Sequence, residues 1–176
     1  MNRRFKTTLI AAGAVFAAAW VAVLFVELGF YNIGADDHHT KLTLALITQL
    51  RDRSIDARLA SIKPQLEATP EMVRAGAQHY AVLCAGCHLA PGIAKSEVRA
   101  GLYPHPPNLA QEEMQESRRA FWIIKHGIKM SAMPAWEKTL DDAAVWDVVA
   151  FVRKMPGMSP EDYQQLAATG NTRAGS

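Results

Sequence analysis

The chain has 176 residues, enough for one ordinary domain and a smaller appendage. Its formal net charge is +2 at pH 7, and three basic residues, Arg3, Arg4 and Lys6, lie ahead of the first apolar run, so the remainder is close to neutral. This balance provides no basic face, and we expect no nucleic-acid partner.

The first thirty residues contain an apolar run that predicts a membrane anchor. Residues 9–26 carry no charge, and as a helix they would span roughly 27 Å, close to the hydrocarbon thickness of a bilayer. The three basic residues precede this run, whereas Glu27, Asp36 and Asp37 follow it. The bias predicts a cytoplasmic N-terminus and places everything after Phe30 on the outer side.

A cleavable signal peptide is the alternative for the same segment, because residues 17–19 (AAA) resemble a cleavage site. The apolar run continues past them to Val26, which is longer than a usual signal sequence, so a retained anchor over residues 1–30 is favoured. Both alternatives deliver the following domain to the same side of the membrane.

Residues 31–68 are predicted to hold a turn, an amphipathic helix and a linker. The turn covers residues 32–37, and a linker follows the break at Lys63-Pro64. Between them, residues 40–62 predict a helix whose apolar stripe lies opposite charged residues; the stripe comprises Leu42, Leu46, Ile47, Leu50, Leu59 and Ile62. That stripe could contact the next domain, the bilayer surface or a partner subunit.

Residues 69–158 are predicted to form the main domain, with one helix at each end. Thr69-Pro70-Glu71 is a helix-start signal and predicts a helix to about Cys84, while residues 141–154 predict a second, aromatic helix. Gly76 and Tyr80 share a face of the first helix. We expect the helices to cross at Gly76 with Tyr80 beside Trp146; the alternative is that Gly76 is merely tolerated.

The chain's two cysteines lie in the stretch Cys84-Ala85-Gly86-Cys87-His88. Two thiols at this spacing can form thioethers with the vinyl groups of one haem, and the next residue then offers its imidazole to the iron. The motif predicts one covalently attached haem c, bound through Cys84 and Cys87, with His88 as an axial ligand.

The cysteine pair has three alternative uses. A zinc site would have to recruit His79, His105 or His126, without a second cysteine pair. A redox dithiol would require a βαβ setting that the sequence does not suggest. A disulfide between the two cysteines would close a very short loop and stabilise little.

The adjacent His38 and His39 could ligate a metal or a second haem, but a covalent haem would need another cysteine pair. The alternative is a pair of solvated histidines close to the membrane.

The segment after the motif is predicted to wrap the cofactor. A carbonyl at Pro91-Gly92 is expected to accept the His88 Nδ1–H bond, and residues 103–109, with three prolines, form a rigid loop. A helix is predicted over residues 111–126 and ends at Gly127. Residues 159–176 are predicted as a C-terminal tail, disordered from Gly170 onward.

The second axial ligand is predicted to be Met133, because Pro134 fixes the backbone after it and removes a donor. Met130, His105 and His126 are the alternatives. Met155 and Met158 are expected to be packing residues. A His/Met pair fills both axial positions of the iron, which favours electron transfer over catalysis.

The order of these parts resembles a class I mono-haem cytochrome c: a GxxxY helix, CAGCH, a proline loop with PPNL, MPAW and an aromatic C-terminal helix. The resemblance covers roughly residues 69–156 and implies an all-α cytochrome c fold around one covalent haem. It further implies thioethers at Cys84 and Cys87, a proximal His88, a distal Met133 and a helix contact at Gly76 and Tyr80. The preceding anchor and amphipathic helix are similar to those of membrane-bound cytochromes.

The function expected from this resemblance is that of a one-electron carrier rather than an enzyme. The carrier would be a single-pass protein of a bacterial inner membrane with a periplasmic haem domain. It would relay electrons from a dehydrogenase or quinol-oxidising complex to a terminal acceptor, so its partners would be a respiratory complex or a periplasmic dehydrogenase. The alternatives are a haem enzyme or ligand sensor in which Met133 is displaced, and a fixed cytochrome subunit of a larger respiratory complex.

Overall fold

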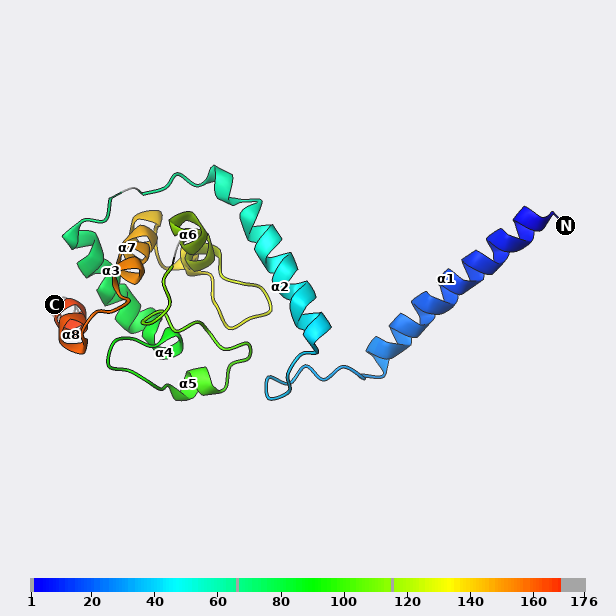
Figure 1. The fold of residues 1–176 in the computed structure, drawn as a ribbon, viewed down its shortest axis with the longest axis horizontal. Helices are drawn as coiled ribbons and strands as arrows, with labels where there is room; N and C mark the ends of the chain where they lie inside the picture. Colours follow the sequence, from blue (N-terminus) through cyan, green and yellow to red (C-terminus); the bar gives the residue numbers. More distant parts are fainter. Residues whose placement is uncertain (1, 66, 115, 169–176) are drawn as a thin grey trace. The chain divides into compact units, whose positions relative to one another are not determined.

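The computed structural model describes residues 2–65, 67–114 and 116–168 and confirms the prediction of a helical protein. No β-strand occurs among these residues, and Ala90 and Ile93 form one isolated bridge. In chain order the elements are α1 (Arg3–Glu27), α2 (Lys41–Asp56), η1 (Leu59–Ser61), α3 (Pro70–Leu83), α4 (Ala85–His88), α5 (Glu97–Ala100), α6 (Ser117–His126), η2 (Trp136–Lys138), α7 (Asp142–Lys154) and α8 (Pro160–Ala168) (Figure 1).

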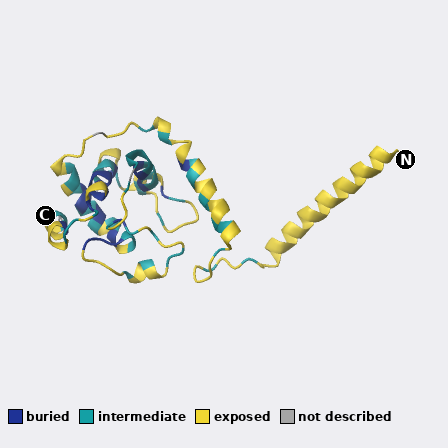
Figure 2. Ribbon diagram, viewed as in Figure 1, coloured by how far each residue is buried: buried dark blue, intermediate teal, exposed yellow. Residues whose placement is uncertain are grey.

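The chain separates into two compact units, one ending at Asp37 and the other beginning at His38. In the first unit, helix α1 has no buried residue and is exposed along its whole length (Figure 2). It is long and apolar enough to cross a membrane. The predicted turn after it is present, with Asp37 N donating to Gly34 O at 3.1 Å. The finer domain boundaries at residues 68 and 158 stay predictions.

The second unit is built around the crossing of α3 and α7, which contact each other extensively. Helix α3 starts where the sequence predicts, because Thr69 Oγ1 accepts from Met72 N at 3.3 Å and Pro70 occupies the first turn. Helix α7 is capped by Asp141, whose carboxylate accepts from Ala144 N at 2.8 Å. Figure 2 shows that buried residues concentrate in these helices and in α6.

The two helices cross at Gly76, as predicted. A Cβ atom at this position would lie 1.9 Å from Asp147 O of α7, so only glycine allows this approach. The predicted contact of Tyr80 with Trp146 is wrong. The Tyr80 ring lies 5.2 Å from the ring of Phe151, whereas Trp146 stacks on Phe121 at 4.4 Å. Trp146 and Phe151 are five residues apart on α7, so they point in directions that differ by about 140° around the helix axis.

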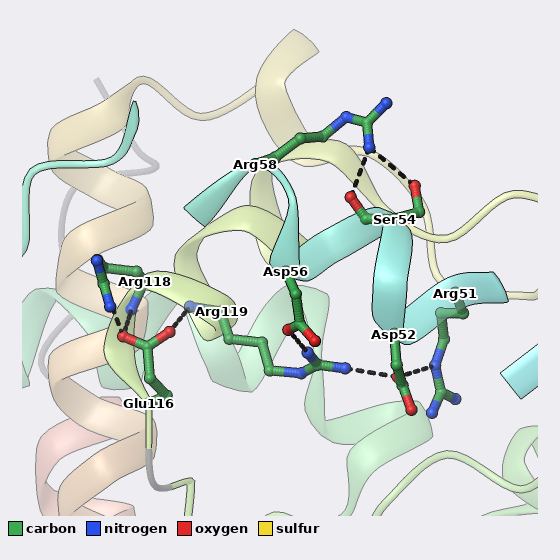
Figure 3. Close-up of polar contacts among 8 residues, drawn as sticks. All are labelled: Arg51, Asp52, Ser54, Asp56, Arg58, Glu116, Arg118 and Arg119. Atoms are coloured by element: carbon green, nitrogen blue, oxygen red, sulfur yellow. Dashed lines mark hydrogen bonds and ion pairs between the residues drawn. The ribbon is translucent and has the colours of Figure 1, made fainter. Parts of the chain in front are cut away.

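Helix α2 is shorter than predicted, ending at Asp56 instead of Ile62. The chain leaves the helix there and turns through η1, so that Ile55 is buried and Ile62 packs against the core. Arg119 of α6 reaches across to α2 and binds Asp52 at 2.5 Å and Asp56 at 2.6 Å (Figure 3). The helix therefore ends before its apolar periodicity does, at the point where its last turn contacts α6.

Helix α6 begins at Ser117, later than the predicted residue 111. Glu116 supplies the cap, since its carboxylate accepts from Arg118 N at 3.2 Å and from Arg119 N at 2.9 Å. The helix ends at Gly127, with φ +65°, as predicted.

Helix α8 lies within the stretch predicted as a C-terminal tail. It contacts α3, and its Tyr163 is buried, with the ring stacked 6.1 Å from that of Phe151. Ser159 caps this helix by accepting from Asp162 N at 3.0 Å. The disorder predicted from Gly170 onward lies outside the described residues.

Candidate haem site

Cys84, Cys87 and His88 are held in one helical turn at the end of α3. Cys84 terminates α3, and the amides of Cys87 and His88 both donate to its carbonyl, at 3.0 and 2.9 Å. Leu89 then adopts a positive φ of 62° and ends α4. The structure therefore brings together the three motif residues by local backbone hydrogen bonds, as their spacing predicts.

The hydroxyl of Tyr80 holds the backbone at the end of this turn. It donates to Leu89 O at 2.6 Å in a buried hydrogen bond. Burial, more than the neighbouring Cys84 or Tyr163, raises the pKa of Tyr80 above its usual range, so the phenol stays protonated and remains a donor. The ring of Tyr80 therefore packs between the crossing helices, and its hydroxyl fixes the backbone directly after the motif.

The imidazole of His88 is oriented by the proline loop, not by Pro91-Gly92 as predicted. Its Nδ1 lies 3.0 Å from Pro107 O, and Leu109 N donates to His88 O at 3.2 Å. The correction follows from chain geometry: the backbone turns away after Leu89, and the loop at residues 103–109 returns alongside His88.

The tautomer that donates from Nδ1 leaves Nε2 of His88 with a lone pair for a metal. Burial lowers the pKa of His88, and the nearby charge of Arg99 acts in the same direction against the opposing Pro107 hydrogen bond. A neutral imidazole with one nitrogen anchored to a carbonyl is the form that ligates iron.

Arg99 and the proline loop form a contact that the sequence analysis does not identify. Its Nη2 donates to Pro106 O at 3.0 Å, whereas its Nε is buried without a hydrogen-bond partner in the described part of the chain. A buried, unpaired cationic donor near His88 fits an anionic group such as a carboxylate of a bound cofactor. A lone arginine has no sequence signature for this role.

The Cys84 thiol lacks the lowered pKa of a reactive cysteine. Both thiols are free and half-buried, and burial, followed by the proximity of Cys87, raises the pKa of Cys84 to about 12. Reactive cysteines need a lowered pKa, since the thiolate is the nucleophile. Burial therefore disfavours the Cys84 thiolate that thiol exchange would require.

The zinc alternative lacks a ligand set. Among the residues that the structure describes, no group of three or more His, Cys, Asp and Glu side chains is placed to hold a metal ion. His105 Nδ1 lies 3.2 Å from Arg99 O, and His126 lies 3.6 Å from a Glu137 carboxylate oxygen.

Met133 and Met130, the two methionines considered for the second axial position, have opposite environments. Met133 is partly buried against the same core cluster as Cys84. Met130 is fully exposed at 105% and has a positive φ of 57°. Burial against the core favours Met133. Met155 and Met158 pack in or against this core, as expected of packing residues.

The loop that carries Met133 is fixed by the backbone of Gly127. A Cβ atom on Gly127 would lie 2.6 to 2.7 Å from three backbone atoms of residues 133–135. Ile128 N donates to Met133 O at 3.1 Å, and Met133 N donates to Ser131 Oγ at 3.2 Å. The end of α6 therefore determines the path of the chain through Met133.

His38, which is exposed, and His39, which is half-buried, both lie against the ring of Tyr103. The ring of His38 stacks on Tyr103 at 4.3 Å and 11°, and His39 meets the same ring edge-on at 5.5 Å. They contact the proline loop and not a cluster of further metal ligands.

These features define a helical domain with a haem-attachment turn, a main-chain acceptor for its histidine and a helix crossing at a glycine. Residues 71–152 match the family described as cytochrome C oxidase, cbb3-type, subunit III. The match supports a mono-haem c-type cytochrome domain at these residues, which implies haem-based electron transfer, and membrane anchoring fits the apolar helix α1. No curated protein matches the chain closely enough to count as a relative.

Proposed function

We propose that this protein is a membrane-anchored one-electron carrier. Its single haem c would be attached through Cys84 and Cys87 and ligated by His88 and Met133. The observation that carries the proposal is the hydrogen bond between His88 Nδ1 and Pro107 O, which leaves Nε2 available to iron. When bound, the haem would supply a one-electron redox centre.

The chain's own residues would hold the cofactor and control access to it. The Pro107 carbonyl makes the His88 imidazole a more basic ligand, and Met133 would fill the second axial position. A haem held by both residues would offer no open position to oxygen or peroxide. Arg99 offers a buried donor to an anionic edge of the cofactor.

The ligand assignment is tested by comparing Met133→Ala with Met130→Ala. Both chains should attach haem, because neither residue is part of the attachment turn. We expect the methionine-to-iron absorption band at the red edge of the spectrum to disappear in the first variant and persist in the second, exposed control. Persistence of the band in Met133→Ala, or its loss in Met130→Ala, would contradict the assignment.

The membrane topology is proposed from the charges that flank helix α1. Basic residues precede the apolar run and acidic residues follow it, which supports a cytoplasmic N-terminus and a periplasmic haem domain in a bacterial inner membrane. Protease added to spheroplasts should cleave the haem domain; protection of the haem domain until the membrane is opened would reverse the orientation.

The partners proposed are redox proteins of a respiratory chain. A dehydrogenase or quinol-oxidising complex would donate the electron and a terminal acceptor would receive it. Slow binding of cyanide and carbon monoxide by the untreated protein is expected of a carrier with two axial ligands, and rapid binding would indicate a haem enzyme or sensor.

The family description favours a second candidate, a fixed cytochrome subunit of a respiratory oxidase complex. Extraction in mild detergent followed by sizing separates the two candidates. Recovery as a free monomer supports the mobile carrier, whereas stable co-elution with a larger haem-containing complex supports the subunit.

A further inference from the structure

Helix α2 has apolar residues on two sides. Only one side packs against the rest of the second unit, the part that carries the candidate haem site and that we call the haem unit. Ile55 is 1% exposed where α2 meets α6. Leu42, Leu46 and Leu50, which we call the leucine stripe, are 70%, 57% and 71% exposed. Because they are spaced four residues apart, they form one continuous line along the helix. Figure 2 shows the mainly exposed length of α2.

Two acidic residues of α2 face the other helices of the second unit, because Asp52 and Asp56 both bind Arg119 of α6 (Figure 3). Arg51 also pairs with Asp52, at 2.9 Å. Arg53 follows Leu50 by three residues and therefore borders the leucine stripe, and Lys41 begins the helix one residue before Leu42. A basic residue thus lies beside the stripe at Arg53, and another at its N-terminal end.

A short tether limits how far the leucine stripe can lie from helix α1. The stacking of His38 and His39 on Tyr103 ties the chain to the haem unit from residue 38 onward. Only residues 28–37 remain between α1 and this attachment, and ten residues span at most about 35 Å. The stripe begins four residues beyond His38.

The tether itself is apolar. Leu28, Phe30 and Ile33 are 64%, 70% and 89% exposed, which is unusual for a linker that extends into water. Such side chains partition into the interfacial layer of a bilayer, which keeps the tether close to the membrane surface.

We propose that the leucine stripe lies in the interfacial layer of the bilayer, so that α2 rests on the lipid surface as an amphipathic helix and holds the haem unit there. The proposal rests on the membrane anchor of the proposed function. Leu42, Leu46 and Leu50 would enter the boundary between headgroups and acyl chains, while Lys41 and Arg53 would contact anionic headgroups.

Lipid fits this surface better than a protein partner does. Protein interfaces concentrate binding energy in Trp, Tyr and Arg, with Leu under-represented, and they bury about 800 Å² per partner. Three leucines without an aromatic residue cover only part of such an area. A bilayer requires only aliphatic burial and a basic flank, and the tether makes the contact intramolecular.

The test uses the full-length haem protein in vesicles of phosphatidylcholine containing phosphatidylglycerol. A spin label is attached to Leu46→Cys, or to the control Gln164→Cys on α8, since the native thiols are consumed by haem attachment. Collisions with oxygen report lipid, and collisions with a water-soluble nickel chelate report solvent. We expect the label at 46 to be several-fold less accessible to the chelate than the label at 164, and more accessible to oxygen.

Each other outcome overturns the proposal in an identifiable way. If the protein stays in the vesicles and both labels are open to the chelate, the anchor stands and the inference fails. If the label at 46 is shielded from both reagents, protein covers the stripe. If the protein does not remain with the vesicles after carbonate washing, the anchor of the proposed function fails as well.

A second pair of variants tests whether the stripe drives the contact. With the label at Leu50→Cys, the double change Leu42→Asp and Leu46→Asp should return the label to water and leave the haem spectrum unchanged. Val98→Asp on α5 changes an equally exposed aliphatic residue, at 59%, and should not move the label. Retention of the label in lipid in the double variant would overturn the proposal.

Discussion

Gly76 leaves room for the main chain of α7, because a Cβ atom there would meet Asp147 O at 1.9 Å and Phe151 Cβ at 2.8 Å. A carbonyl on the backbone of a packed helix cannot rotate aside in the way that a flexible side chain can. The nearest available response is a shift of the whole helix, which would also disturb the rings packed around Phe151.

Gly76→Ala is therefore expected to lower the free energy of unfolding by about 3 kcal/mol or more. Guanidinium titration of the haem protein, followed by circular dichroism, measures the change. Gly101→Ala is the matched control, because the nearest atom to its Cβ would be Val98 O at 3.8 Å, and it should change stability by less than about 0.5 kcal/mol. Equal stability of the two variants would show that the crossing tolerates a methyl group.

Tyr80→Phe keeps the ring and removes the donor to Leu89 O. Because the carbonyl of Leu89 is buried, leaving it unsatisfied should cost about 1–3 kcal/mol. Denaturant titration at neutral pH tests this. The control is Tyr103→Phe, which removes the hydroxyl of a half-buried tyrosine and keeps its ring stacked on His38. A larger loss of stability in Tyr103→Phe than in Tyr80→Phe would contradict the role given to the Tyr80 hydrogen bond.

The same residue predicts an alkaline dependence of stability. Burial raises the folded-state pKa of Tyr80 above the unfolded value of about 10, so its contribution is complete below that pH and declines as the pH rises beyond it. Denaturant titrations from neutral to strongly alkaline pH should give a steeper decline for the native chain than for Tyr80→Phe. Parallel curves would assign the decline to other groups.

At the scale of elements, the contact of α2 with the haem unit depends on Ile55 and on the ion pairs of Arg119. Ile55→Ala should weaken this contact by about 2–5 kcal/mol, because the side chain is fully buried. Amide hydrogen exchange should accelerate in α2 and remain unchanged in α7. Leu46→Ala, at an exposed position of the same helix, should leave both rates unchanged, and similar acceleration in the two variants would contradict the packing.

The starts of α3 and α7 and the end of α6 follow from neighbouring residues, which is why they were predictable. Thr69 and Asp141 cap their helices through bonds to amides three residues on, and Gly127 ends α6 with a positive φ. The start of α8 carries the same kind of signal in Ser159 and Pro160, and a search for N-caps over the whole chain would have found it.

Two other errors concern contacts between residues far apart in sequence. Pro107 lies nineteen residues from His88, and nothing in the local pattern distinguishes its carbonyl from that of Pro91. The end of α2 at Asp56 depends on Arg119, sixty-three residues away from that carboxylate. Periodicity describes one helix at a time, and it does not report which distant group shortens it.

At the scale of the whole molecule, the division at residue 38 predicts that the haem unit folds without its anchor. Helix α1 contributes no buried residue. A protease site introduced after Gly34 should release a soluble fragment whose haem spectrum and unfolding midpoint equal those of the uncut protein measured in the same buffer. A shifted spectrum or a lowered midpoint would show that the unit depends on the anchor.

The acceptor for His88 Nδ1 is a main-chain carbonyl, and this has a consequence for inheritance. A carboxylate in that role could be deleted by one nucleotide change, whereas every amino acid at position 107 still provides a carbonyl. Only a replacement that displaces the loop can remove the bond, such as one that disturbs Arg99 Nη2 on Pro106 O. Few single substitutions can therefore abolish the orientation of His88. The sequence of the loop can change during evolution while His88 keeps its orientation.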